Sequence, residues 1–340
     1  MISLKPLTKN SSVSLFIDLS KAFDTVDHAI LRQRLSSVGL SEHAVAWFAN
    51  YLSNRTQCTQ FDGLMSVKLS VFNGVPQGSV IGPLLFTIYI NDLDKNVQHP
   101  QLHFYVDDTV IYCCASSLTE AFQNLQTAFY TVQHTFRQLK LILNIDKTKL
   151  MLFSKARNRP LNLSPITTCQ GKEIEVVTKY KYLGILIDDG LSFKLHIQQL
   201  TTKLKLKLAF YFRNKACFSF EARRRLVSAT CMPLLDYGDI LYMNASAQCL
   251  RSIDTLYHGT LRFILNCKTL THHCTLYTRV GWPSLATHRL SHWYTFIYKA
   301  ILGLLPFYLG IFIVQKCGGY SLRSLDFILL TVPNVRTEFG

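Results

Sequence analysis

Apolar and polar positions follow two different periods along the chain, which predicts an α+β fold. Apolar residues recur at helical spacing over residues 118–139, and Ser41 can cap a second helix that ends near Leu52. Shorter helical patterns cover residues 29–35 and 84–93. Strands are predicted at residues 14–19, 102–106, 110–112, 150–153 and 181–187, and a hairpin at 56–72. Beyond Ser192 the pattern is mainly helical through about residue 264.

An Asp-Asp pair lies between two of the predicted strands. Residues 102–106 precede Asp107 and Asp108, and residues 110–112 follow them, which predicts a β-hairpin with both carboxylates at its tip. Adjacent negative charges are unfavourable unless a positive charge lies against them. Mg²⁺ is a suitable partner, because it binds one or two carboxylates together with substrate phosphates. An ordinary Asp-rich turn is the alternative.

Composition narrows the class of protein. Hydrophobic residues make up 49% of the 340 residues and charged residues 17%, so the chain can bury a large core and is not disordered. The net charge of +15 predicts an anionic partner, either nucleic acid or a membrane surface. On a predicted helix, Lys203, Lys207 and Arg213 belong to a basic run that fits either a solvated face or a phosphate-binding surface.

The same features indicate an intracellular protein, in nucleus or cytoplasm, that is not secreted. The N-terminus carries no apolar signal segment, and the ten cysteines show no regular pairing distances. The apolar run 300–314 is short for a membrane span and contains Pro306, so we expect a buried helix or strand pair and no membrane contact. Length and a composition shift predict two domains, 1–191 and 192–340.

Two further segments could join the Asp pair in one site. Asp18 ends a predicted apolar strand that could neighbour the hairpin. Carboxylates placed this way could hold two metal ions about 3.5–4 Å apart, which would clamp the attacking and leaving oxygens of a phosphoryl displacement. Residues 74–79 contain two glycines that permit close approach to a ligand, and Gln77 offers a donor and an acceptor to a sugar or base. A simple turn is the alternative for 74–79.

Taken in order, these segments resemble reverse transcriptase motifs A to E in the form used by LINE-type non-LTR retrotransposons. The matching segments are 16–28 (FIDLSKAFDTVDH), 74–83 (GVPQGSVIGP), 105–108 (YVDD), 143–149 (LNIDKTK) and 182–184 (YLG). Five motifs in the family order are specific, and the resemblance continues weakly to the end of the chain. It implies a polymerase palm, with an antiparallel sheet and helices on one face, followed by a helical thumb-like region.

The resemblance also implies roles for individual residues. Asp18, Asp107 and Asp108 match the catalytic carboxylates that bind two Mg²⁺ ions, with Mn²⁺ as a possible substitute. Lys147 matches a proton donor to the leaving pyrophosphate, although a solvated loop lysine explains it equally well. Residues implied to contact the dNTP or template are Phe23, as the sugar gate, Gln77, Gly78 and Tyr105. Residues implied to track an RNA template and DNA primer are Lys203, Lys207 and Arg213.

The implied function is RNA-directed DNA polymerase activity by two-metal nucleotidyl transfer. One alternative is a decayed, inactive remnant that only binds nucleic acid. Only seventeen residues precede Asp18, so we expect a fragment without the fingers and the endonuclease of the family. Another alternative is an RNA-templated RNA polymerase, which Phe23 and the YVDD form disfavour. Val106 stands where many members have Ala.

Two cysteine-containing clusters have weaker interpretations. Cys267, His272, His273 and Cys274 could bind zinc, but their spacing lacks the usual C-x-x-C pair. Cys113 and Cys114 are predicted to be buried core thiols. Host, target site, template RNA and oligomeric state are not encoded in any of these patterns.

Overall fold

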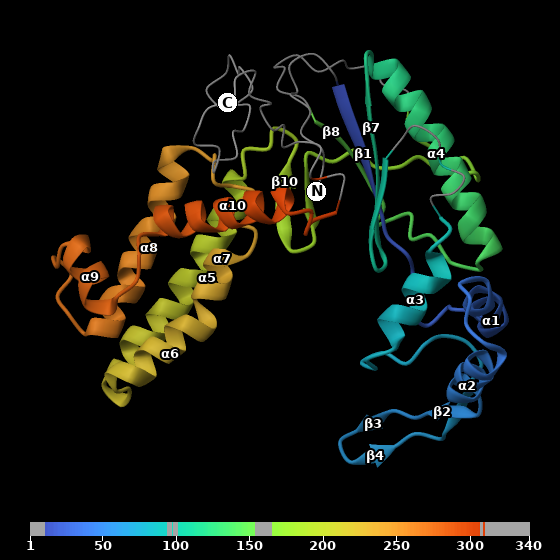
Figure 1. Ribbon diagram of the computed structural model, residues 1–340, viewed down its shortest axis with the longest axis horizontal. Helices are drawn as coiled ribbons and strands as arrows, with labels where there is room; N and C mark the ends of the chain where they lie inside the picture. The colour runs from blue at the N-terminus through green and yellow to red at the C-terminus, as the bar shows by residue number, and fades with distance from the viewer. Residues whose placement is uncertain (1–10, 94–96, 98–100, 154–164, 307–308, 310–340) are drawn as a thin grey trace, which may run out of the picture. The chain divides into compact units, whose positions relative to one another are not determined.

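The chain divides into two compact units, Met1–Leu183 and Gly184–Gly340. The computed structural model describes residues 11–93, 97, 101–153, 165–306 and 309. Each unit encloses a separate hydrophobic core (Figure 1). The boundary between the units falls at Leu183, earlier in the chain than the domain boundary expected after residue 191.

A four-stranded antiparallel sheet forms the centre of the first unit, in the order β6-β7-β1-β8 (Figure 1). The strands are β1 (Ser11–Ile17), β6 (Gln101–Tyr105), β7 (Asp108–Ala115) and β8 (Lys149–Phe153). The inner strand β1 is buried on both faces: Leu15 packs in the main core, whereas Phe16 stacks on Tyr180. This explains why its last three residues, 15–17, are consecutive apolar residues and do not alternate with polar ones.

Helices cover the core side of this sheet, as the sequence predicts. The longest, α4, contacts β1 and β7, and its N-cap Ser117 accepts a hydrogen bond from the Glu120 amide. The helices of this unit are α1 (His28–Ser37), α2 (Glu42–Leu52), α3 (Gly82–Ile90) and α4 (Leu118–Gln138). Helix α3 begins two residues before the predicted start, because Ser79 Oγ accepts from the Gly82 amide and Pro83 suits the first turn.

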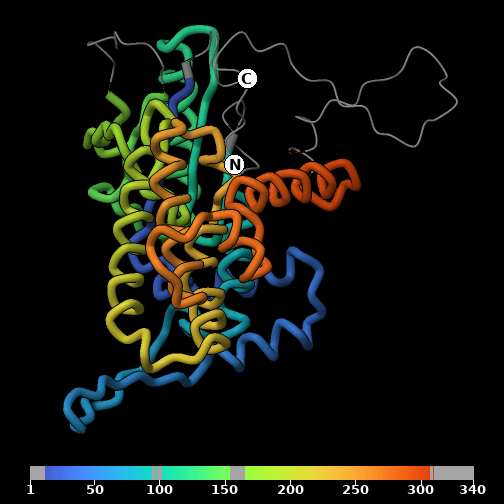
Figure 2. Tube along the Cα trace, turned by 90° about the vertical axis from the view of Figure 1, so that its left-hand side faces the viewer, coloured from blue at the N-terminus to red at the C-terminus, as the bar shows by residue number. Residues whose placement is uncertain are grey.

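The chain also forms small hairpins outside the central sheet. The predicted hairpin at 56–72 is confirmed as two ladders, which extend away from the sheet in both views (Figures 1 and 2). Its strands are β2 (Arg55–Gln57), β3 (Gln60–Phe61), β4 (Leu64–Met65) and β5 (Leu69–Val71). The prediction of one strand over 181–187 is wrong, because this segment belongs to two strands joined by a turn. Leu183 and Gly184 have positive φ and make a tight turn between β9 (Lys179–Tyr182) and β10 (Ile185–Asp188).

The second unit is a helical assembly built around the packing of α5 on α8. Its helices are α5 (Lys194–Arg213), α6 (Phe220–Thr230), α7 (Met232–Asp236), α8 (Ala247–Leu265), α9 (His273–Val280) and α10 (Leu285–Ile301). Of the apolar run 300–314, only 300–306 and 309 lie within the described residues. None of the helices in the described ranges is long and apolar enough to cross a membrane.

The two adjacent cysteines of β7 differ in burial. Cys113 lies in the core as predicted, whereas Cys114 is exposed. The prediction of two core thiols is therefore wrong for Cys114, because successive side chains of a strand point to opposite faces of the sheet.

Candidate active site

Three carboxylates converge at one end of the central sheet. Asp18 directly follows β1 and Asp108 begins β7, and the pairing of Ile17 with Thr109 brings the two residues side by side. Asp107 lies in the turn that precedes Asp108. Burial raises the pKa of the Asp108 carboxyl, and the negative charges of Asp107 and Asp18 raise it further. The three carboxylates are thus close enough to repel one another.

The turn that carries Asp107 is strained. Tyr105 pairs with Asp108, so Val106 and Asp107 form a two-residue hairpin turn. Val106 has φ +59°, an unfavourable conformation for a β-branched residue. Such strain costs about 1–3 kcal/mol and persists only where the surrounding structure imposes it. Here the long β6–β7 ladder imposes it and fixes the position of Asp107.

The segment after α4 holds Asp18 in place. The Asn144 amide donates to the Asp18 carbonyl at 2.9 Å, and the Asp18 amide donates to Thr148 Oγ1 at 3.4 Å. Thr148 is fully buried. Lys147 extends from the same segment and places its Nζ 3.9 Å from Asp18 Oδ2, while its side chain stays largely exposed. Lys147 therefore reaches the carboxylate of Asp18.

Sequence reasoning missed one residue beside the carboxylates. The Tyr180 ring stacks on Phe16 at 4.2 Å between centroids. Burial raises the pKa of its hydroxyl, and the negative charges of Asp108 and Asp18 add to that shift. The sequence signal was the alternation Lys-Tyr-Lys-Tyr in β9, which puts Tyr180 and Tyr182 on one face of the strand.

The predicted loop 74–79 packs closely against the segment that follows Asp18. The Gly74 amide donates to the Val26 carbonyl at 2.7 Å, and the Val75 amide donates to the Phe23 carbonyl at 2.8 Å. Gln77 Nε2 donates to Asp24 Oδ1 at 2.8 Å. Motifs A and B therefore form one connected backbone unit.

The substrate residues implied by the motifs differ in exposure. Gln77, Gly78 and Tyr105 are exposed. Phe23 is half-buried and stacks on the buried ring of Phe86, with centroids 5.0 Å apart. Phe23 thus combines a core contact with a partly open face.

Substitution of Gly74 is expected to destabilise the first unit strongly. An added Cβ would lie 2.8 Å from Asp24 Cα, and φ is +87°. Gly63 has a similar positive φ of +78° with open space around it, so Gly63→Ala measures the backbone strain alone. We expect Gly74→Ala to lower the free energy of unfolding by about 3 kcal/mol or more, and Gly63→Ala by about 1 kcal/mol. Equal losses in urea unfolding would refute the close approach.

The three predicted nucleic-acid-binding cations lie on α5, in the second unit. Lys203 and Arg213 are exposed and Lys207 is half-buried. Lys203 and Lys207 are four residues apart and share a helix face as predicted. Within the described part of the chain, none of the three forms an ion pair with a carboxylate. Their charges are available to an anionic partner.

Comparison with known proteins decides the family. The family described as "Reverse transcriptase (RNA-dependent DNA polymerase)" matches residues 3–187. The chain belongs to this reverse transcriptase family. The resemblance drawn from motifs A to E is therefore confirmed.

Named relatives agree with the family. The probable RNA-directed DNA polymerase from transposon X-element of Drosophila melanogaster is 25% identical over 271 residues, which cover 78% of this chain and 29% of that protein. The polymerase from mobile element jockey of the same species is 27% identical, over 75% of this chain and 28% of that protein. The chain thus spans under a third of the length of these relatives. Telomerase from Candida tropicalis, solved with a telomeric RNA fragment, aligns over 82% of this chain and 41% of that chain, at 13% identity and a TM-score of 0.42.

Proposed function

We propose that this reverse transcriptase chain forms the catalytic part of an RNA-directed DNA polymerase of a LINE-type element. The observation that carries the proposal is the convergence of Asp18, Asp107 and Asp108 at the ends of adjacent strands. The reaction would be two-metal nucleotidyl transfer, with dNTPs as substrates on an RNA template and a DNA primer.

The donor set of the site fits divalent cations of the magnesium type. Carboxylate oxygens are hard ligands, and burial together with the negative charges of Asp107 and Asp18 raises the pKa of the Asp108 carboxyl, which a divalent cation would offset. Asp18, Asp107 and Asp108 would hold two Mg²⁺ ions, and Mn²⁺ could replace them. When bound, the ions would activate the attacking primer hydroxyl and neutralise charge on the triphosphate.

The chain's own side chains would position the reactants. Lys147 lies 3.9 Å from Asp18 Oδ2, so its ammonium can stay near the triphosphate and donate a proton to the leaving pyrophosphate. The hydrogen bond from Gln77 to Asp24 orients the amide of Gln77, and exposed Gly78 lets a ligand approach the backbone. Tyr105 would contact the same ligand from the hairpin.

Primer extension on a poly(rA)–oligo(dT) duplex tests the proposal. The assay is run with this chain and with a longer version that carries the fingers segment expected from the family. Extension that requires Mg²⁺ and dTTP supports the enzyme. The second hypothesis, an inactive remnant, predicts duplex binding without extension in either version. Titration with Mn²⁺, followed by electron paramagnetic resonance, adds a direct readout of the carboxylate site.

Removal of the α5 cations is expected to weaken binding of an RNA–DNA duplex and to reduce its salt dependence. Each lost phosphate contact lowers the slope of log K against log salt by about 0.9 for a B-form duplex, so Lys203, Lys207 and Arg213 changed to Gln together should lower it by about 2 to 3. The matched control removes three exposed charges of the same unit, at Arg251, Lys268 and Arg279. Unchanged affinity and slope would show that the α5 cations form only a solvated face.

A further inference from the structure

The second unit contains a cluster of metal-ligating side chains that the proposed polymerase reaction does not use. His288 and His292 come from α10, and Asp236 ends α7. One ligand atom from each of the three residues lies within 4.8 Å of the others, and all three residues are half-buried. The cluster joins residues that are more than fifty positions apart in sequence.

The two histidines lie on one face of α10. They are four residues apart, which aligns side chains along a helix, and their ring centroids are 4.5 Å apart. His288 Nδ1 lies 3.1 Å from Asp236 Oδ1. Both atoms are closed to solvent and face each other in this ion pair. A metal ion could bind both atoms in place of the proton that otherwise joins them, because an imidazole nitrogen and a carboxylate oxygen are both metal ligands.

A second carboxylate fixes the ring of His292. Asp239 is 3% exposed, and its Oδ2 accepts a hydrogen bond from His292 Nδ1 at 2.8 Å. The donated proton leaves Nε2 as the basic nitrogen of His292. Metal-ligating histidines commonly donate their other ring N–H to a carboxylate in this way. Asp239 would therefore be a positioning residue for a metal ligand.

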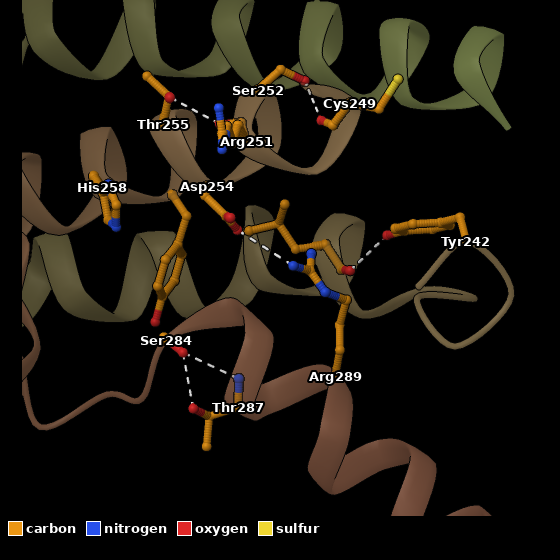
Figure 3. Close-up of polar contacts among 12 residues, drawn as sticks. Tyr242, Cys249, Arg251, Ser252, Asp254, Thr255, His258, Ser284, Thr287 and Arg289 are labelled. Carbon is orange, nitrogen blue, oxygen red and sulfur yellow. Dashed lines mark hydrogen bonds and ion pairs between the residues drawn. The ribbon is translucent and has the colours of Figure 1, made fainter. Parts of the chain in front are cut away.

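Polar contacts of nearby residues, some of them drawn in Figure 3, hold the helices that carry the cluster. Between the two histidines, Arg289 forms an ion pair with Asp254 of α8 at 3.4 Å, and the Ser284 side chain caps α10 through the Thr287 amide. The Tyr242 hydroxyl donates to the Leu235 carbonyl at 3.0 Å, next to Asp236. The ligand positions are therefore set by independent contacts.

We propose that Asp236, His288 and His292 bind one zinc ion, which ties the end of α7 to α10, with Asp239 orienting His292. Imidazole and carboxylate groups are established zinc ligands, and three protein ligands leave a fourth tetrahedral position for water. At bond lengths near 2.0 Å, two ligand atoms of tetrahedral zinc are roughly 3.3 Å apart. The distance of 3.1 Å between His288 Nδ1 and Asp236 Oδ1 is close to this value. The other ligand atoms of the cluster lie within 4.8 Å, so small rotations of the side chains would bring them to the zinc.

A second cluster provides the internal control. His272, His273 and Cys274 also gather within 4.8 Å, but all three are exposed. His272 Nδ1 already accepts a hydrogen bond from the Cys274 amide at the start of α9. Cys267, which the sequence grouped with them, is not part of this set. Variants of this exposed cluster can therefore report on adventitious zinc binding.

The test is metal binding by the full chain after removal of bound metal with a chelator. Zinc is titrated by calorimetry in millimolar Mg²⁺, so that the polymerase carboxylates do not contribute. We expect one tight site per chain and a rise in the melting temperature of the second unit. The double variant His288→Gln/His292→Gln should lose both effects, whereas His272→Gln/His273→Gln should keep them. Asp239→Asn should weaken zinc affinity by about 10- to 100-fold.

Cobalt substitution distinguishes the alternatives even if a variant fails to fold. Co²⁺ bound to the wild-type chain should give the visible spectrum of a nitrogen and oxygen site, without thiolate-to-cobalt charge transfer. Zinc binding that survives the double variant, or a cobalt spectrum with thiolate bands, would assign the metal to the cysteines instead. The absence of any tight zinc site would leave two metal-free Asp–His pairs and overturn the proposal.

Discussion

Asp107→Asn is expected to abolish Mg²⁺-dependent primer extension while leaving the first unit folded. The side chain sits in the strained β6–β7 turn, beside Asp108 and near Asp18. Loss of one metal-binding carboxylate removes several kcal/mol of transition-state stabilisation, and about 4 kcal/mol corresponds to roughly a thousandfold in rate. The measurement is the rate of poly(rA)–oligo(dT) extension, made with this chain or with the longer version that carries the fingers segment, depending on which of them is active. Asp62→Asn, at an exposed hairpin turn, is the matched control.

The pH dependence of stability separates this effect from unfolding. The folded-state pKa of Asp108 is raised above its ordinary value of 3.8, so the folded state binds its proton more tightly. The free energy of unfolding therefore falls as pH rises from about 3.8 through the folded pKa. Asp107→Asn removes one cause of the shift, so we expect a smaller fall and a higher melting temperature without metal at neutral pH. Primer extension that survives Asp107→Asn would contradict the carboxylate site. A free energy of unfolding of the wild-type chain that does not change with pH would contradict it as well.

Phe23→Val is expected to relax discrimination between deoxyribonucleotides and ribonucleotides. The ring follows Asp18 by five positions and presents a partly open face, so it could occupy the space that a ribose 2′-hydroxyl requires. Incorporation of dTTP should stay within about tenfold, an effect of about 1.4 kcal/mol, whereas that of UTP should rise by much more. The measurement is kcat/KM for both nucleotides on the same primer.

The stack of Phe23 on Phe86 provides the competing explanation. Truncation there removes core packing and should lower the free energy of unfolding by a few kcal/mol. Phe122 is a buried core residue of α4, so Phe122→Val is the matched control for the loss of stability. If Phe23→Val and Phe122→Val reduce dTTP and UTP incorporation alike, with an unchanged ratio, Phe23 is a core residue and not a sugar gate.

The sequence alone determined the elements and the motif residues of the first unit. Helical spacing placed α4 to within a residue, and alternating or continuous apolar runs located β1 and the β6–β7 hairpin. These features follow from local periodicity, because burial of one face imposes a fixed repeat on each element. The order of motifs A to E then indicated the family that the comparison confirmed.

Other features were decided only by tertiary structure. Thr148 and Asn144 hold the backbone of Asp18 from 130 and 126 positions away. The cluster of Asp236, His288 and His292 likewise forms only when α7 and α10 pack together. Local periodicity reports which face of an element is buried, but not which distant element covers it. Contacts of this kind depend on chain topology, and a polar residue that finds its partner across the fold has the same local pattern as one that faces water.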